Sequence, residues 1–139
     1  MALVRELSFA LLNDAEESYK QNGKFLEEVL QSLHDVFGEV FVKSADFLET
    51  GEVVRYETPN AIRAVLKVGN KKEVYTLFDD INFCHCGTFA RVLSGEGLLT
   101  CEHVLAARLA RISGRMKVNR LTDLQYVEFV SDLVDYIKE

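Results

Sequence analysis

A cluster of cysteines and histidines between Cys84 and His103 constrains this chain more than any other feature. The segment holds all three cysteines of the protein and two of its three histidines, arranged as Cys-x-Cys, fourteen residues and Cys-x-His. Two close pairs of ligands separated by a loop suit a small tetrahedral ion, because each pair supplies one edge of the tetrahedron and the loop lets the edges meet. The pattern predicts one structural zinc ion, Zn2+, bound by Cys84, Cys86, Cys101 and His103.

A zinc ion with these four ligands would have no free coordination position. Water and substrate are then kept from the metal, and the ion contributes to folding and not to catalysis. A zinc hydrolase or deaminase would need an open position beside a general base, and Glu102 alone does not provide one. The sequence also lacks a glycine-rich phosphate loop followed by Lys and Ser or Thr. We therefore expect a protein that is not an enzyme and takes no small-molecule substrate; the alternative for the cluster is three buried, reduced cysteines without a metal.

Length and composition are those of one soluble globular domain. The chain has 139 residues, of which 48% are hydrophobic and 27% charged, a balance that can bury a core and is unlike that of disordered chains. We expect no membrane span and no signal peptide, since apolar runs are short and the amino terminus alternates charged and apolar residues. Clustered cysteines of this kind are typical of a reducing compartment. The cytosol or the nucleus is therefore expected.

Residues 1–50 are predicted to be helical. Apolar residues recur at helical spacing in residues 2–20 and again from about Lys24 to Phe37, and Gln21-Asn22-Gly23 ends the first helix. The short joint favours an antiparallel helical hairpin. Residues 39–50 fit either a short helix or an alternating strand, and we favour the helix.

Residues 51–113 are predicted to hold a small antiparallel β-meander and the zinc finger. Three runs rich in β-branched and aromatic residues, 53–56, 62–68 and 73–78, are separated by turn sequences. A short helical piece is expected around Phe89, and a longer helix from Cys101 to about Ser113, with Thr100 as its cap and Gly114 as its stop. The expected fold class is therefore α+β within one domain, 1–139.

Strands, a Cys-x-Cys at the end of a hairpin, and a Cys-x-His that opens a helix together resemble the SWIM zinc finger. The extended form of that motif ends Cys-x-His-x-x-Ala, and the segment from Cys101 to Ala106 matches it at every specified position. The layout further resembles the small SWIM subunit of Shu-type homologous recombination complexes, although recognisable motif covers only residues 62–113. The resemblance implies a ββα finger in which Ala106 is a packing position and His85 occupies a variable, unliganded one.

The resemblance also implies a function. In Shu-type complexes the SWIM protein pairs with a RecA-type recombinase paralogue, and the pair promotes or stabilises recombinase filaments on single-stranded DNA. It thus implies a heterodimer or larger complex, joint contact with single-stranded DNA, and a place in the nucleus, with the cytoplasm as a second location. The alternative is a SWIM-type protein–protein interaction adaptor outside recombination.

Basic residues gather after the metal motif. Residues 91–120 carry six basic and two acidic side chains, although the whole chain has a net charge of −6. Three arginines at i, i+3 and i+7 are predicted to share a helix face, with two more basic residues just beyond. Contact with DNA phosphates or an acidic partner and a merely solvated helix face both remain open. The basic stripe comprises Arg108, Arg111, Arg115, Lys117 and Arg120.

Residues 121–138 are predicted to form a terminal helix. The sequence Thr122-Asp123-Leu124-Gln125 is a capping box. Apolar residues cover so much of the helix circumference that it needs deep burial or a protein partner. We favour a partner interface, with the amino-terminal hairpin as the rival surface.

Overall fold

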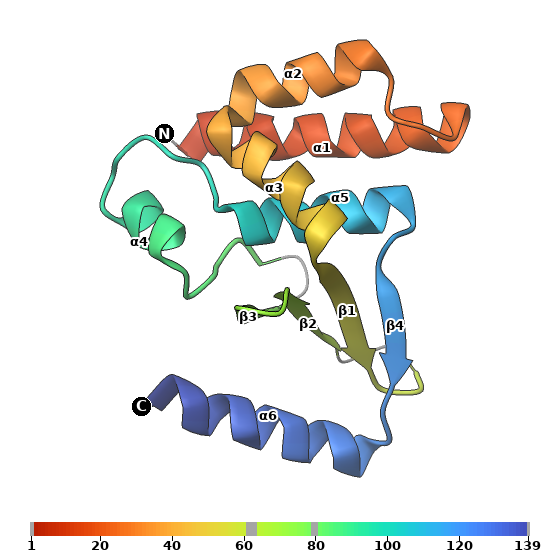
Figure 1. Cartoon of the computed structure of the whole chain (residues 1–139), viewed down its shortest axis with the longest axis vertical. Coiled ribbons are helices and arrows are strands. Elements are labelled where there is room, and N and C mark those ends of the chain that lie inside the picture. Colours follow the sequence, from red (N-terminus) through yellow and green to blue (C-terminus); the bar gives the residue numbers. More distant parts are fainter. Residues whose placement is uncertain (1, 61–63, 79–80, 139) are drawn as a thin grey trace.

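The computed structural model describes the backbone of residues 2–60, 64–78 and 81–138, and the side chains of the same ranges between residues 6 and 131. Figure 1 shows the elements stacked in layers: a pair of helices, a second helical layer, a sheet, and a last helix on the far side of the sheet. The predicted α+β class is confirmed. In chain order the elements are α1 (Ala2–Asn22), α2 (Glu27–Phe37), α3 (Glu39–Thr50), β1 (Glu52–Glu57), β2 (Ala64–Gly69), β3 (Val74–Phe78), α4 (Gly87–Leu93), α5 (Glu102–Ser113), β4 (Lys117–Arg120) and α6 (Asp123–Lys138).

The amino-terminal helices form the predicted hairpin and one further helix. α1 and α2 lie side by side, and Gly23 adopts a φ of 70° where α1 ends. Only Gly38, with a φ of 60°, separates α2 from α3, and a positive φ is readily adopted by glycine. Residues 39–50 are helical, as favoured: the buried residues Val40, Ser44 and Phe47 recur at helical spacing.

The sheet has four strands in the order β3-β2-β1-β4. The antiparallel meander β1-β2-β3 is confirmed, with Val53 opposite Val68 and Leu66 opposite Leu77. β4 pairs with β1 in parallel, Val54 lying opposite Lys117, and the sequence had not indicated this strand. All four of its residues are exposed, so it shows no apolar alternation, and its strand conformation comes from backbone pairing with the edge of β1.

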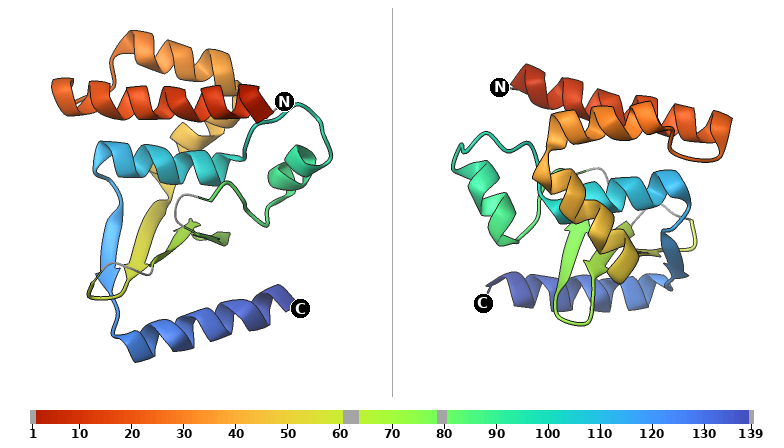
Figure 2. Two further views of the ribbon diagram at one scale, coloured as in Figure 1. Left: turned by 180° about the vertical axis from the view of Figure 1, so that it is seen from behind. Right: turned by 45° about the horizontal axis from the view of Figure 1, so that its top comes forward.

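α5 lies between two cores. Figure 2 shows α3 crossing α5 between the helical hairpin and the sheet. One core, which we call the zinc-side core, joins α5 to the sheet, α3 and α4; α5 contributes Val104, Ala106, Ala107 and Ala110 to it. The other, the hairpin core, joins α5 to α1, α2 and α3 through Leu105 and Leu109. The alanines have little side-chain bulk, which allows the close approach of α3 and the sheet.

α6 lies along the outer face of the sheet. The Phe129 ring packs on Tyr56 with ring centroids 5.0 Å apart, and the ammonium of Lys67 lies 4.7 Å from the Phe129 centroid. The capping box is confirmed, because the Thr122 amide donates to Gln125 Oε1 at 2.9 Å and the Gln125 amide donates to Thr122 Oγ1 at 3.2 Å. Across the described helices, no segment is both long and apolar enough to cross a bilayer.

Candidate metal centre

The four predicted ligands meet in one buried cluster. The Sγ atoms of the three cysteines and a ring nitrogen of His103 all lie within 4.8 Å of one another, and each residue is at most 6% exposed. His103 Nδ1 is 3.8 Å from Cys84 Sγ and 4.0 Å from Cys101 Sγ. Ligands on a tetrahedral zinc ion lie about 3.6 Å apart for a sulfur and a nitrogen. Donor type, spacing and burial therefore fit one zinc ion.

Each ligand pair is placed by the start of a helix. Cys86 is the N-cap of α4, where its sulfur accepts from the Phe89 amide at 3.4 Å, and Cys101 is the N-cap of α5, where its sulfur accepts from the Val104 amide at 3.5 Å. Amide donors and the positive end of a helix stabilise a thiolate, the form that binds metal. The prediction that Thr100 caps α5 is wrong: the cap is one residue later, and cysteine is not a residue type that signals a cap.

The thiols of the cluster shift one another's pKa in opposite directions. Hydrogen bonding with Cys101, then with Cys84, holds the pKa of the Cys86 thiol far below its usual range. Hydrogen bonding with Cys84, then with Cys86, together with burial, raises the pKa of the Cys101 thiol. Zinc binds cysteine as the thiolate, so binding of the ion releases the protons that these thiols carry.

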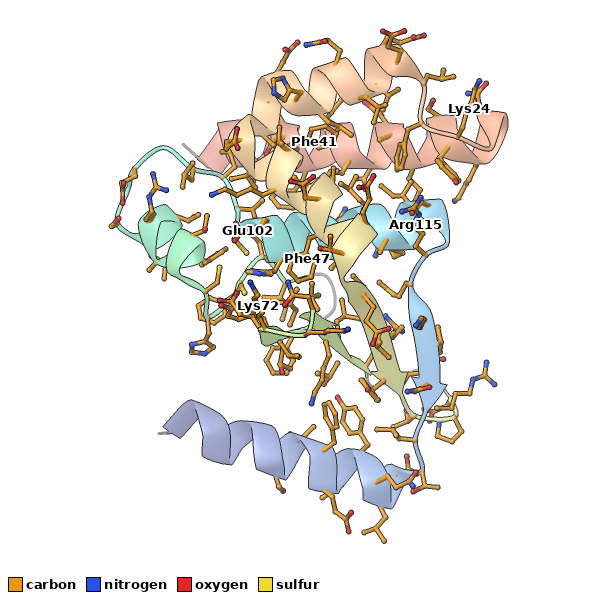
Figure 3. The ribbon with its side chains drawn as sticks, in the orientation of Figure 1. Lys24, Phe41, Phe47, Lys72, Glu102 and Arg115 are labelled. Carbon is orange, nitrogen blue, oxygen red and sulfur yellow. The ribbon has the colours of Figure 1, made fainter. Side chains whose placement is uncertain are left out.

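Two aromatic rings fix the orientation of the His103 imidazole. The Phe47 ring from α3 meets it edge-on, with centroids 5.1 Å apart, and the Tyr75 ring from β3 lies 4.2 Å away; Figure 3 shows Phe47 beside the start of α5. Burial, followed by the hydrogen bond to Glu73, raises the pKa of Tyr75 to about 12, so its phenol stays neutral and donates to Glu73 Oε2 at 3.2 Å. Neither ring was singled out from the sequence, because each reads as an ordinary apolar position of its element.

Three residues near the ligands in the sequence, His85, Ala106 and Glu102, are not ligands and make other contacts. His85 is exposed and packs edge-on against Phe83, 5.2 Å between centroids, and it is outside the ligand group. Ala106 is fully buried in the zinc-side core. Glu102 accepts from the Thr88 hydroxyl at 3.3 Å and so joins α5 to α4.

The first two residues of the predicted basic stripe, Arg108 and Arg111, lie on α5 and contact α1. Arg108 lies over the Phe9 ring of α1, 5.5 Å from its centroid, and donates to Asn13 Oδ1 at 3.4 Å. Arg111 Nε lies 3.8 Å from Oε2 of Glu16, which is also on α1.

The remaining basic residues follow the end of α5. Arg115 comes after the left-handed Gly114 cap, is exposed, and lies at the opposite end of α5 from Glu102 (Figure 3). Lys117 and Arg120, on β4, pair with Glu52 at 2.7 Å and Glu57 at 3.6 Å. Because α5 ends at Ser113, Arg115 does not share a helix face with Arg108 and Arg111, contrary to the prediction. Contact of the five residues with DNA or a partner stays a prediction.

Comparisons with known proteins agree with the site. No protein-family model matches the chain, and no solved structure matches it. Zinc finger SWIM domain-containing protein 7 of Danio rerio is 26% identical over 122 residues, which cover 87% of this chain and 87% of that protein. The protein of the same name from Mus musculus is 24% identical over 129 residues, covering 92% of this chain and 85% of that protein. Similarity over most of the chain, with a buried cluster of three cysteines and one histidine at the motif positions, confirms the predicted resemblance to SWIM-type zinc finger proteins.

Proposed function

We propose that this protein is a non-catalytic, zinc-binding subunit of a DNA recombination and repair complex. The observation that carries the proposal is the closed cluster of Cys84, Cys86, Cys101 and His103, whose four donors leave a tetrahedral ion no position for water or substrate. The ion would cross-link the chain before α4 to the start of α5, and so fix the relative orientation of the two helices. The relatives are named as SWIM zinc finger proteins, and their names state no enzymatic activity.

The proposed partner is a RecA-type recombinase paralogue. The pair would promote the assembly or stability of recombinase filaments on single-stranded DNA, in the nucleus and secondarily in the cytoplasm. This part rests on the resemblance of the motif and layout to the SWIM subunit of Shu-type complexes. Nucleotide hydrolysis would come from the partner, since this chain has no phosphate-binding loop.

The exposed side of α6 is the proposed contact surface for that partner. Leu124 is 70% exposed and Val127 is 52% exposed, one helical turn apart on the side away from Phe129. Residues 121–139 carry five acidic side chains and one basic. A complementary partner surface would therefore be an apolar groove bordered by Lys and Arg.

Replacing Leu124 and Val127 together by Asp is expected to release the partner. Desolvated apolar anchors contribute about 1–3 kcal/mol each to protein interfaces, so co-purification from cells should fall by about tenfold or more. Zinc content and melting temperature should be unchanged, because both residues are exposed. The measurement is the amount of ATPase-like companion recovered with the tagged, full-length chain.

A matched control lies on the rival surface, where Leu7 of α1 is 63% exposed. Leu7→Asp should leave co-purification intact. Loss of the companion with Leu7→Asp and not with the α6 variant would assign the interface to the hairpin. A stable wild-type monomer that never co-purifies with such a companion would contradict the proposed function itself.

Charge reversal in the basic stripe tests DNA contact by the complex. Replacing Arg108, Arg111 and Arg115 by Glu should weaken binding to single-stranded DNA and flatten its dependence on salt, because phosphate contacts release counterions. Since Arg108 and Arg111 also contact α1, Arg115→Glu is measured beside the triple variant. Lys72→Glu is the control, an exposed residue of the β2–β3 turn far from Arg115 in Figure 3. DNA affinity equal to wild type in the triple variant would show that the stripe is structural.

A further inference from the structure

One side chain joins the two chain segments that carry the ligand pairs. Asn82 lies two residues before Cys84, and its amide reaches the two residues that directly precede Cys101. Its Nδ2 donates to the backbone carbonyl oxygen of Leu99 at 3.1 Å, and its Oδ1 accepts from the hydroxyl of Thr100 at 2.6 Å. We call these three residues, Asn82, Leu99 and Thr100, the amide bracket.

The hydrogen bonds of the amide bracket are largely shielded from solvent. Thr100 is 1% exposed and Asn82 is half-buried, so water competes little for either hydrogen bond. The bonds link positions 17 and 18 residues apart in the chain. The planar amide of Asn82 donates through Nδ2 and accepts through Oδ1 at the same time, whereas a carboxylate only accepts.

We propose that Asn82 is a positioning residue of the metal centre. Its two side-chain hydrogen bonds go to Leu99 and Thr100 and not to a ligand. It acts by fixing the distance between the backbone that carries Cys84 and the backbone that carries Cys101. With the bracket in place, the two halves of the cluster are already adjacent when zinc arrives. Without the bracket, zinc binding must also order the intervening loop, and the entropy lost in doing so lowers the zinc affinity. This inference depends on zinc binding alone and not on the role in recombination.

The test is zinc affinity of the full-length protein, measured by competition with a chelator, together with the rate of zinc release. Asn82→Ala and Thr100→Val should each weaken zinc binding by about tenfold or more, the range seen for partners that orient metal ligands. The double variant should bind zinc with the same affinity as the more affected of the two single variants, because both changes break the same bracket. Thr100→Ser keeps the hydroxyl and should restore wild-type affinity.

A second asparagine separates positioning from general stability. Asn70 Oδ1 accepts from the Lys72 and Glu73 amides at 2.8 and 3.0 Å in the β2–β3 turn, so Asn70→Ala also loses two hydrogen bonds. It should lower the melting temperature and leave zinc affinity within twofold of wild type. If Asn82→Ala behaves in the same way, or if Thr100→Val and Thr100→Ser bind zinc equally well, the positioning role is refuted. Should Asn82→Ala fail to fold, the Val and Ser variants of Thr100 decide the question.

Discussion

Cys101→Ser is expected to abolish stoichiometric zinc binding and to lower the free energy of unfolding by at least about 3 kcal/mol. A structural zinc ion contributes about 10–16 kcal/mol of apparent binding free energy in isolated fingers. We expect a smaller loss here because the chain also has the hairpin core, to which none of the four ligands belongs. Cys101 is fully buried, supplies one ligand and caps α5 with its sulfur. Serine is a poor zinc ligand, and without the ion the remaining ligands no longer join the chain before α4 to the start of α5. The measurements are metal content per chain and denaturant unfolding.

His85→Ala is the matched control for that variant. His85 lies between two ligands in sequence, yet it is exposed and outside the cluster. Its replacement should leave both zinc content and stability as in wild type. Full zinc retention with unchanged melting in Cys101→Ser would overturn the ligand assignment, and zinc loss in His85→Ala would place that histidine among the ligands.

The ligand set could be predicted from the sequence because its signal is local. Each ligand pair is separated by one residue, and the composition of the chain leaves few other ways to group its cysteines. The meander and the capping box at Thr122 were also predicted, since alternation and turn residues are read within a few positions. The strand β4 was not, because its residues are all exposed and only the edge of β1 makes it a strand.

The residues that surround the ligands could not be predicted, because tertiary folding brings them together from segments distant in the sequence. Phe47 and Tyr75 reach His103 from α3 and β3, and nothing within either segment marks them as neighbours of a metal ligand. Thr100 was assigned to a local cap, but its hydroxyl donates to Asn82, 18 positions away. Likewise, the spacing of Arg108 and Arg111 predicted a shared helix face without showing that α1 packs over it.

α5 connects these observations, because it serves a different core on each side. Its first turn carries Cys101 and His103 toward the zinc-side core, whereas Leu105 and Leu109 enter the hairpin core. The four ligands lie outside the hairpin core, so we expect the metal to stabilise mainly the zinc-side core. The two contributions should be separable by substitution.

Leu105→Ala is accordingly expected to cost about 2–5 kcal/mol of unfolding free energy, the usual range for a fully buried leucine, while zinc content stays at one ion per chain. Leu105 has no exposed surface and packs in the hairpin core, so the cavity forms on the side of α5 away from the ligands. Leu124→Ala, the same change at a residue 70% exposed, should shift the unfolding free energy by less than about 0.5 kcal/mol. Denaturant unfolding and metal analysis of both variants check the expectation. Zinc loss in Leu105→Ala as complete as in Cys101→Ser would mean that the metal centre forms only when the hairpin core is intact, and the two sides of α5 would then be one cooperative unit.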